Sequence, residues 1–338
     1  MTLDHAVALS LLDALPRVGL TDRLFSDDPE LLDAATAELP RARRVRDEAT
    51  AAGIGVIAWN APSFPAGLLM TTDCPPVLWF RGLPTVFDAP SVAVVGSRAA
   101  SAVALATASR IGEELAANGV VVVSGLARGV DSAAHRGALR CGRTIAVLGS
   151  GVDRIYPREH AALAADIAAT GLVTSEFPPG SAPLPFRFPL RNRVISALSR
   201  GVVVIEASEQ SGSLITAACA LEQGREVMVV PGNVLSGRNR GGHALLRDGA
   251  RLVESADDIL TELGLRPRAV SQKPTSDGQS TNCDDPLLRS MDAGVPYDLD
   301  TLAGATGLPA GRLLPLLSEL ELRHLITRLE GGRFMRSA

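Results

Sequence analysis

The fold can be inferred from one stretch of the sequence, Val92-Ala93-Val94-Val95-Gly96-Ser97-Arg98. Four consecutive apolar residues closed by glycine predict a short buried strand. Behind it, Ser101 is a favoured helix N-cap, because its hydroxyl can accept from the free N–H groups of a first turn. Apolar residues then recur at helical spacing, at Ala104, Ala108, Ile111 and Leu115. The stretch therefore predicts a strand, a tight turn and a helix.

This unit repeats along the chain. Short apolar runs predict further strands over residues 120–123, 144–148, 172–174, 202–205 and 227–230. Each run ends in small or polar residues, and helical patterns lie between the runs. Strands that alternate with helices pair in parallel and are covered on both faces. The sequence thus predicts an α/β fold with a doubly wound parallel sheet.

The flanking segments differ in pattern and divide the chain. Residues 1–52 have helical apolar spacing and predict a small helical domain, whereas residues 53–263 hold the α/β pattern with two extra strands at its start. Residues 264–284 are polar, contain Pro and Gly, and predict a linker. Residues 285–338 predict three short helices followed by a hairpin, which is a winged-helix-like pattern.

Composition excludes several classes of protein. The 338 residues carry 33 basic and 37 acidic groups, and Lys273 is the only lysine among the basic ones. An apolar content of 46% is typical of a globular protein. No apolar run reaches the length of a membrane span and no basic signal segment precedes the first apolar stretch, so we expect a cytoplasmic protein. The scattered cysteines predict neither a metal site nor disulfides: Cys74, Cys141, Cys219 and Cys283.

The net charge of −4 hides an uneven distribution. Residues 1–90 carry a net −5, residues 91–263 a net +1, and residues 264–338 are neutral. Two segments of the central part contain no acidic residue, residues 177–205 and 227–247. The first holds three phenylalanines and four arginines: Phe177, Phe186, Phe188, Arg187, Arg191, Arg193 and Arg200. Aromatic rings that stack on bases, beside guanidinium groups that neutralise phosphates, predict a groove for single-stranded nucleic acid.

Four predicted strands end in turns of small residues, where a parallel sheet binds its ligands. Such turns suit phosphate groups, because the backbone can approach a ligand closely and hydroxyls add donors. The GxGxxG and GxxxxGK[ST] patterns are absent, which argues against a dinucleotide cofactor and against nucleotide hydrolysis of the P-loop type. His135 follows Asp131 by four residues, and we expect this pair to order the turn and not to catalyse. We therefore expect no catalytic residues, no metal and no cofactor.

The C-terminal pattern does not favour duplex DNA. Its third predicted helix offers Arg312 and Arg323 against Glu319 and Glu321. The C-terminal domain is equally well interpreted as a module that binds a protein partner or regulates the protein.

Taken together, these motifs resemble the DNA-processing protein A family, also called DprA or Smf. The matching segments, in chain order over about residues 55–260, are residues 92–98, 124–135, 156–157, 175–178, 188–196, 211–217 and 231–233. The resemblance implies an extended Rossmann-like doubly wound parallel sheet, a SAM-like N-terminal domain and a winged-helix-like C-terminal domain. It also implies a homodimer that binds single-stranded DNA, protects incoming strands in natural transformation, displaces single-strand-binding protein and loads the RecA recombinase in recombination.

Carried over motif by motif, the resemblance and the arginine-rich segment give the predicted DNA contacts. They are Gly96, Ser97, Arg98, Gly125, Arg128, Arg187, Phe188, Arg191, Asn192, Arg193, Ser211, Gly212, Ser213 and Asn233. Among them we expect Arg98, Arg191 and Arg193 to grip phosphates.

Two alternatives remain open. Rossmann-like phosphoribohydrolases also place a Gly/Ser/Thr turn before an acidic residue, and here residues 211–216 precede Glu222, with Glu206 and Glu176 as further carboxylates. A pure protein-interaction scaffold is the third interpretation.

Overall fold

The computed structural model describes residues 1–12, 15, 17–266, 286–292, 294–322, 325–329 and 331–336. The chain forms two compact units, residues 1–269 and 270–338. The predicted linker, residues 264–284, falls almost entirely outside the described residues.

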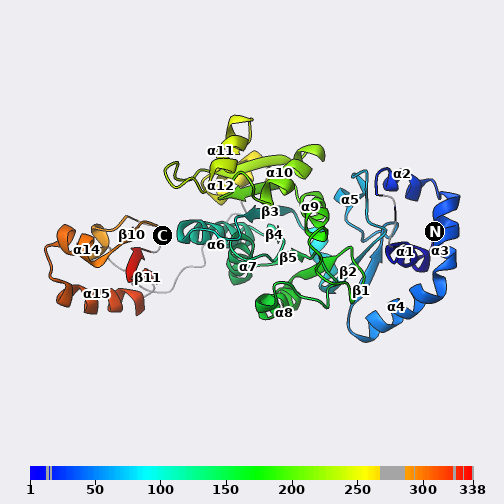
Figure 1. Cartoon of the computed structure of the whole chain (residues 1–338), viewed down its shortest axis with the longest axis horizontal. Helices are drawn as coiled ribbons and strands as arrows, with labels where there is room; N and C mark the ends of the chain where they lie inside the picture. The colour runs from blue at the N-terminus through cyan, green and yellow to red at the C-terminus, as the bar shows by residue number, and fades with distance from the viewer. Residues whose placement is uncertain are drawn as a thin grey trace. The chain divides into compact units, whose positions relative to one another are not determined.

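The first unit is built on a nine-stranded sheet with the order β1-β2-β6-β5-β4-β3-β7-β8-β9 (Figure 1). Strands β3 to β9 pair with one another in parallel, while β1 and β2 add an antiparallel edge. The strands are β1 Gly55–Ala58, β2 Val77–Gly82, β3 Ser91–Gly96, β4 Val121–Ser124, β5 Thr144–Val147, β6 Leu172–Ser175, β7 Gly201–Ile205, β8 Glu226–Val230 and β9 Arg251–Leu252. The predicted parallel sheet is confirmed.

Helices cover both faces of this sheet. They are α5 Ala66–Leu69, α6 Ala102–Ala117, α7 Val130–Cys141, α8 Ala161–Thr170, α9 Arg187–Ala197, α10 Ser213–Glu222, α11 Arg240–Arg247 and α12 Ala256–Glu262, with 3₁₀ turns η1 Pro84–Asp88 and η2 Arg158–His160. Helices α6, α7 and α12 share one core with alternate residues of β3, such as Val92 and Val94. The intervening residues Ala93 and Val95 pack in the other core with α9 and α10. This two-sided burial explains why the strands are apolar throughout.

The order of the strands fixes where a ligand can bind. From β3 the chain winds outward through β4, β5 and β6 on one side, and then returns to place β7 and β8 on the other side of β3. The loops after β3 and β7 therefore leave the sheet in opposite directions. A crevice opens at such a switch point, at the carboxyl ends of the strands.

The N-terminal helices pack on the antiparallel edge of the sheet. They are α1 Leu3–Ser10, α2 Leu20–Phe25, α3 Pro29–Ala37 and α4 Leu39–Ala51. Helices α3 and α4 are separate, with Pro40 in the first turn of α4, because proline fits a first turn and not a helix interior. Leu9 and Leu24 share a core with Trp79 of β2. That residues 1–52 form a domain of their own stays a prediction.

The second unit combines three helices with a small antiparallel sheet. Its elements are α13 Pro286–Arg289, β10 Pro296–Tyr297, α14 Leu299–Thr306, α15 Ala310–Leu322, β11 Ile326–Leu329 and β12 Arg333–Arg336. Leu302, Leu313, Leu317 and Phe334 are buried in its core. The predicted helices and hairpin are confirmed, with β10 as an additional strand. Arg323, predicted for the third helix of this unit, lies outside the described residues.

Within the described ranges, no helix is long and apolar enough to cross a membrane. No group of His, Cys, Asp or Glu among these residues is arranged to hold a metal ion. Cys74 is buried, Cys141 is exposed and Cys219 is partly buried, while Cys283 lies outside the described residues.

Candidate nucleic-acid interface

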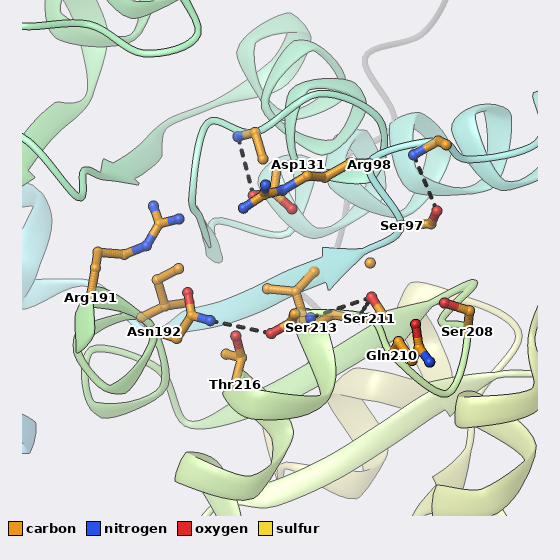
Figure 2. A pocket seen from close by; sticks show the side chains of 16 residues that line it. Ser97, Arg98, Asp131, Arg191, Asn192, Ser208, Gln210, Ser211, Ser213 and Thr216 are labelled. Atoms are coloured by element: carbon orange, nitrogen blue, oxygen red, sulfur yellow. Dashed lines mark hydrogen bonds between the residues drawn. The ribbon is translucent and has the colours of Figure 1, made fainter. Parts of the chain in front are cut away.

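A pocket of about 370 Å³ lies at the switch point, between the loop after β3 and the start of α10. We call it the switch-point pocket. It brings together eight of the predicted DNA contacts: Gly96, Ser97, Arg98, Arg191, Asn192, Ser211, Gly212 and Ser213. Figure 2 shows Arg98 and Asp131 on one side of this pocket and Ser211, Ser213 and Thr216 on the other.

The loop after β3 forms one wall. A Cβ atom on Gly96 would lie 1.9 Å from the carbonyl oxygen of Ile205, so only glycine allows β3 and β7 to end this close together. The Ser97 N–H donates to the carbonyl oxygen of Glu206 at 2.8 Å. The backbone is thereby fixed, while the Arg98 side chain is exposed at the rim. No carboxylate of the described residues pairs with Arg98, so its charge is available to an anion.

The amino end of α10 forms the opposite wall. The N-cap residue Gly212 has no side chain that could cap the helix, and the first N–H groups donate to the preceding turn: Ser213 N–H to Ser211 Oγ at 3.4 Å, Leu214 N–H to the Ser211 carbonyl at 3.1 Å and Ile215 N–H to the Gly212 carbonyl at 3.2 Å. The positive end of the helix dipole still lies at this wall. The Ser211 and Ser213 hydroxyls lie 2.7 Å apart beside them, and Asn192 Nδ2 holds the turn by donating to the Gly212 carbonyl at 3.2 Å. Together with Arg98, this wall makes a site for a phosphate group.

Arg191 lines the switch-point pocket from below, and a contact between it and a phosphate stays a prediction. Its guanidinium is buried, and Nη1 donates to the carbonyl oxygens of Gly125, at 2.8 Å, and of Val147. Burial lowers its pKa to about 10, an effect that Asp131 partly offsets. A Cβ atom on Gly125 would lie 2.5 Å from Nη2, so glycine is required beside the guanidinium. Arg191 thus braces the ends of β4 and β5 beneath the pocket.

Asp131 and His135 do not act as a pair. The Asp131 carboxylate accepts from the N–H groups of Gly125 and Ala127 at 3.1 and 3.3 Å, and burial raises its pKa. His135 Nδ1 lies 2.7 Å from Thr144 Oγ1. Each side chain orders a separate part of the fold.

The buried imidazole of His135 makes stability depend on pH. Burial, with smaller contributions from His160 and Arg191, lowers its pKa to about 3. The unfolded chain takes up a proton below about pH 6.5 that the folded chain does not, so stability falls as the pH drops below that value. We expect His135→Gln to reduce the loss of unfolding free energy between about pH 7 and about pH 5 by about 2 kcal/mol. Urea denaturation at both pH values measures this, and an unchanged pH dependence would contradict it.

A second, smaller hollow adjoins the switch-point pocket and shares Arg98 and Arg191 with it. We call it the aromatic hollow. The rings of Tyr156 and Phe188 lie 5.5 Å apart, and the Arg98 guanidinium lies 5.7 Å from the Phe188 centroid. Tyr156 is 48% exposed. The predicted contacts Gly125 and Arg128 also line this hollow, with Arg128 paired to Glu159.

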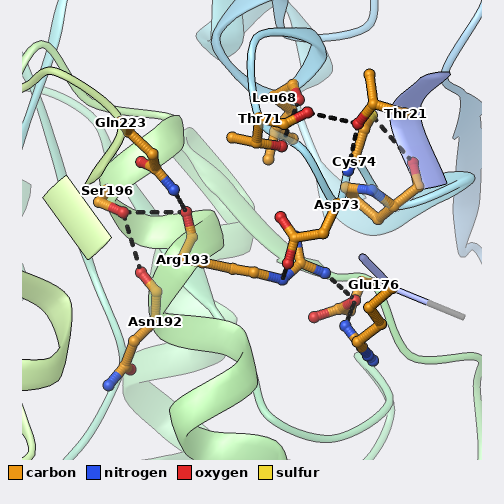
Figure 3. Close-up of polar contacts among 12 residues, drawn as sticks. Thr21, Leu68, Thr71, Asp73, Cys74, Glu176, Asn192, Arg193, Ser196 and Gln223 are labelled. Atoms are coloured by element: carbon orange, nitrogen blue, oxygen red, sulfur yellow. Dashed lines mark hydrogen bonds and ion pairs between the residues drawn. The ribbon is translucent and has the colours of Figure 1, made fainter. Parts of the chain in front are cut away.

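Three predicted contacts lie elsewhere. Arg193 points away from the switch-point pocket, and its guanidinium pairs with Asp73 at 2.8 Å and Glu176 at 2.6 Å (Figure 3). Arg187 packs over the ring of Phe177 at 4.8 Å. Asn233 lines a separate hollow beside the start of α6.

The structure also adds residues that the sequence analysis did not select as contacts. Ser208, Gln210, Thr216 and Ala127 line the switch-point pocket, and Tyr156 lines the aromatic hollow. The position of Ser208 and Gln210 in the loop between β7 and α10 was the available signal, because this loop leaves the sheet at its carboxyl edge.

Comparisons with known proteins agree with this architecture. A family model described as DNA recombination-mediator protein A matches residues 55–264, and a model of the DprA winged helix domain matches residues 271–332. Protein Smf of Escherichia coli strain K12 is 41% identical over 284 residues, 82% of this chain and 76% of Smf. DNA processing protein DprA of Streptococcus pneumoniae is 46% identical over 200 residues, 59% of this chain and 71% of that protein.

Two solved structures have a similar fold. The X-ray structure of DprA from Streptococcus pneumoniae matches with a TM-score of 0.68 and 34% identity, over 77% of this chain and 98% of that one. DNA processing protein A from Helicobacter pylori, described for its single-stranded DNA binding mode, matches with a TM-score of 0.56 and 29% identity, over 62% and 95%.

Proposed function

Because this chain belongs to the DNA recombination-mediator protein A family, also called DprA or Smf, we propose that it binds single-stranded DNA through the switch-point pocket and the aromatic hollow. The observation that carries the proposal is the phosphate site itself. Arg98 is exposed, has no carboxylate partner among the described residues, and faces the amino end of α10 across the pocket. The Ser211 and Ser213 hydroxyls and the positive end of the helix dipole complete a site for a backbone phosphate.

The switch-point pocket and the aromatic hollow can bind different parts of one nucleotide. In the switch-point pocket, Arg98 and the Ser211 and Ser213 hydroxyls would donate to phosphate oxygens at the positive end of the α10 dipole. In the aromatic hollow, Phe188 and Tyr156 offer ring faces for a base. Stacking accepts any base, which suits binding without sequence preference.

We propose that the protein acts by binding and not by catalysis. The carboxylates that a phosphoribohydrolase would need are occupied or distant. Glu206 accepts from the N–H and hydroxyl of Ser101, and Glu176 pairs with Arg17 and Arg193. Glu222 ends α10, about 14 Å along the helix from Ser213. Asp131, the one carboxylate among the described residues that line the pocket, accepts from backbone N–H groups.

Three further features of the function are proposed for this chain because it belongs to the family. They are a homodimeric state, displacement of single-strand-binding protein, and transfer of the strand to the RecA recombinase. Natural transformation and homologous recombination in the cytoplasm are the proposed settings. The family match over residues 55–264, which contain both hollows, supports them.

A titration with fluorescent oligo(dT) tests the binding. We expect the anisotropy to report saturable binding whose affinity falls as salt rises, with a log–log slope of about −0.7 for each phosphate neutralised. Release of base from nucleoside monophosphates is assayed in parallel. Base release without oligo(dT) binding would favour the hydrolase and refute the proposal.

A further inference from the structure

We infer that the bound strand reaches a second contact beyond the two hollows, at Phe186 and Arg187, where one more nucleotide stacks at the mouth of a cavity beside the N-terminal helices. This inference rests on the proposed function and adds a separate site to it. The cavity has a volume of about 690 Å³, and Phe186 and Arg187 line it together with Leu12 and Arg41. We call it the N-terminal hollow.

Phe186 and Arg187 have the chemistry of a stacking site. The Arg187 guanidinium lies 4.8 Å from the ring centroid of Phe177 and 5.9 Å from that of Phe186. Phe177 is buried, whereas Phe186 is 60% exposed. Arg187 Nη1 also donates to the carbonyl oxygen of Ala182 at 3.0 Å, which fixes the guanidinium over the rings. An exposed ring beside an ordered cation offers one face to a base and one charge to a phosphate.

The charges around this hollow leave Arg187 as the group that can meet a phosphate. Arg17 and Arg193 are paired with Glu176, and Arg41 lies 3.4 Å from Glu38. Arg187 has no carboxylate partner among the described residues. One unneutralised guanidinium and one exposed ring match a single nucleotide. Leu12, Pro179 and Leu184 give the wall apolar surface that suits a base, while Ser10 and Ser181 add polar groups.

The start of α9 connects this contact to the aromatic hollow. Phe186, Arg187 and Phe188 are consecutive, and successive residues of a helix point about 100° apart. Phe188 accordingly lines the aromatic hollow, while Phe186 and Arg187 line the N-terminal hollow. No acidic residue occurs between Phe177 and Ile205, and Glu176, which lines the N-terminal hollow, is neutralised by Arg17 and Arg193. The N-terminal helices, despite their net negative charge, therefore border the path of the DNA.

Comparing short with long oligonucleotides distinguishes binding at Phe186 and Arg187 from binding at the switch-point pocket. Wild type, Phe186→Ala and Arg187→Ala are titrated with oligo(dT) of about 4 and about 16 nucleotides, the range of sites that single-strand-binding folds cover. We expect each substitution to weaken binding of the longer strand by about tenfold and to leave the shorter one unchanged. Phe25→Ala is the matched control, because Phe25 is equally exposed at 59% and does not line the hollow.

A fluorescent variant tests the stacking directly. Trp59 and Trp79 are both buried, so a tryptophan introduced by Phe186→Trp is the exposed indole among the described residues. We expect the longer strand to quench its emission and the shorter strand to leave it unchanged. Full binding of the longer strand by Phe186→Ala, without quenching in Phe186→Trp, would overturn the second contact. Failure of wild type to bind either strand would instead refute the proposed function.

Discussion

Replacing Arg98 by alanine is expected to weaken binding of oligo(dT) by about tenfold to a hundredfold. A hydrogen bond to a charged group contributes about 1.5–3 kcal/mol, and each 1.4 kcal/mol is about a factor of ten in affinity. The thermal unfolding temperature should stay nearly constant, because the side chain is exposed and has no carboxylate partner among the described residues. Anisotropy titrations and thermal melts measure the two quantities.

The salt dependence shows whether Arg98 contacts a phosphate. If it does, Arg98→Ala should reduce the log–log slope by about 0.7, the value for one phosphate. Arg98→Lys keeps the charge but loses the planar fork, so we expect an intermediate affinity with a normal slope. Arg140→Ala is the control, because Arg140 is exposed in the last turn of α7, away from the pocket. An equal loss of stability and affinity in Arg98→Ala would mean that Arg98 is structural.

Arg193→Ala is expected to lower the free energy of unfolding by about 3–5 kcal/mol, the cost of removing one partner from a buried ion pair. The Arg193 and Glu176 side chains are 8% and 6% exposed. Without Arg193, the buried Glu176 carboxylate would keep only Arg17, and Asp73 would lose its partner (Figure 3). Each kcal/mol lowers the unfolding temperature of a domain of this size by about 2–4 °C.

The control for Arg193→Ala is a surface pair. Arg140 and Glu113 lie 2.8 Å apart and are largely exposed, so Arg140→Ala should cost no more than about 1 kcal/mol. Oligo(dT) binding is compared well below the unfolding temperature, where Arg193→Ala should retain most of its affinity. If Arg193→Ala lost oligo(dT) binding while its free energy of unfolding stayed unchanged, Arg193 would be a phosphate contact and not a structural residue.

Arg98, Arg191 and Arg193 show which features of a binding site local sequence can predict and which it cannot. The apolar run of β3 and its closing glycine are contiguous, so the sequence could predict that Arg98 lies at the carboxyl edge of the sheet, where the structure has it. The segment without acidic residues led us to expect phosphate grips at Arg191 and Arg193 as well. Their partners, Val147 and Asp73, are distant in sequence, and composition within a window does not reveal them.

The fold was predictable where burial is continuous along the chain. Strands β3 to β8 were all expected, since each is an apolar run buried on both faces. Strand β9 was missed because it is two exposed residues long, and β10 is similarly short. Such strands exist through pairing with a neighbour, so their own residues carry little signal.

The pairing of β3 with β7 also determines at which stage of folding the switch-point pocket forms. The two walls of the switch-point pocket come from separate parts of the chain, joined where Glu206 accepts from Ser101, 105 residues away. A nascent chain that has folded only β3 to β6 holds Arg98 but not the start of α10. The phosphate site is then complete only once β7 and the start of α10 have joined β3, and an occupied pocket would slow hydrogen exchange between β3 and β7.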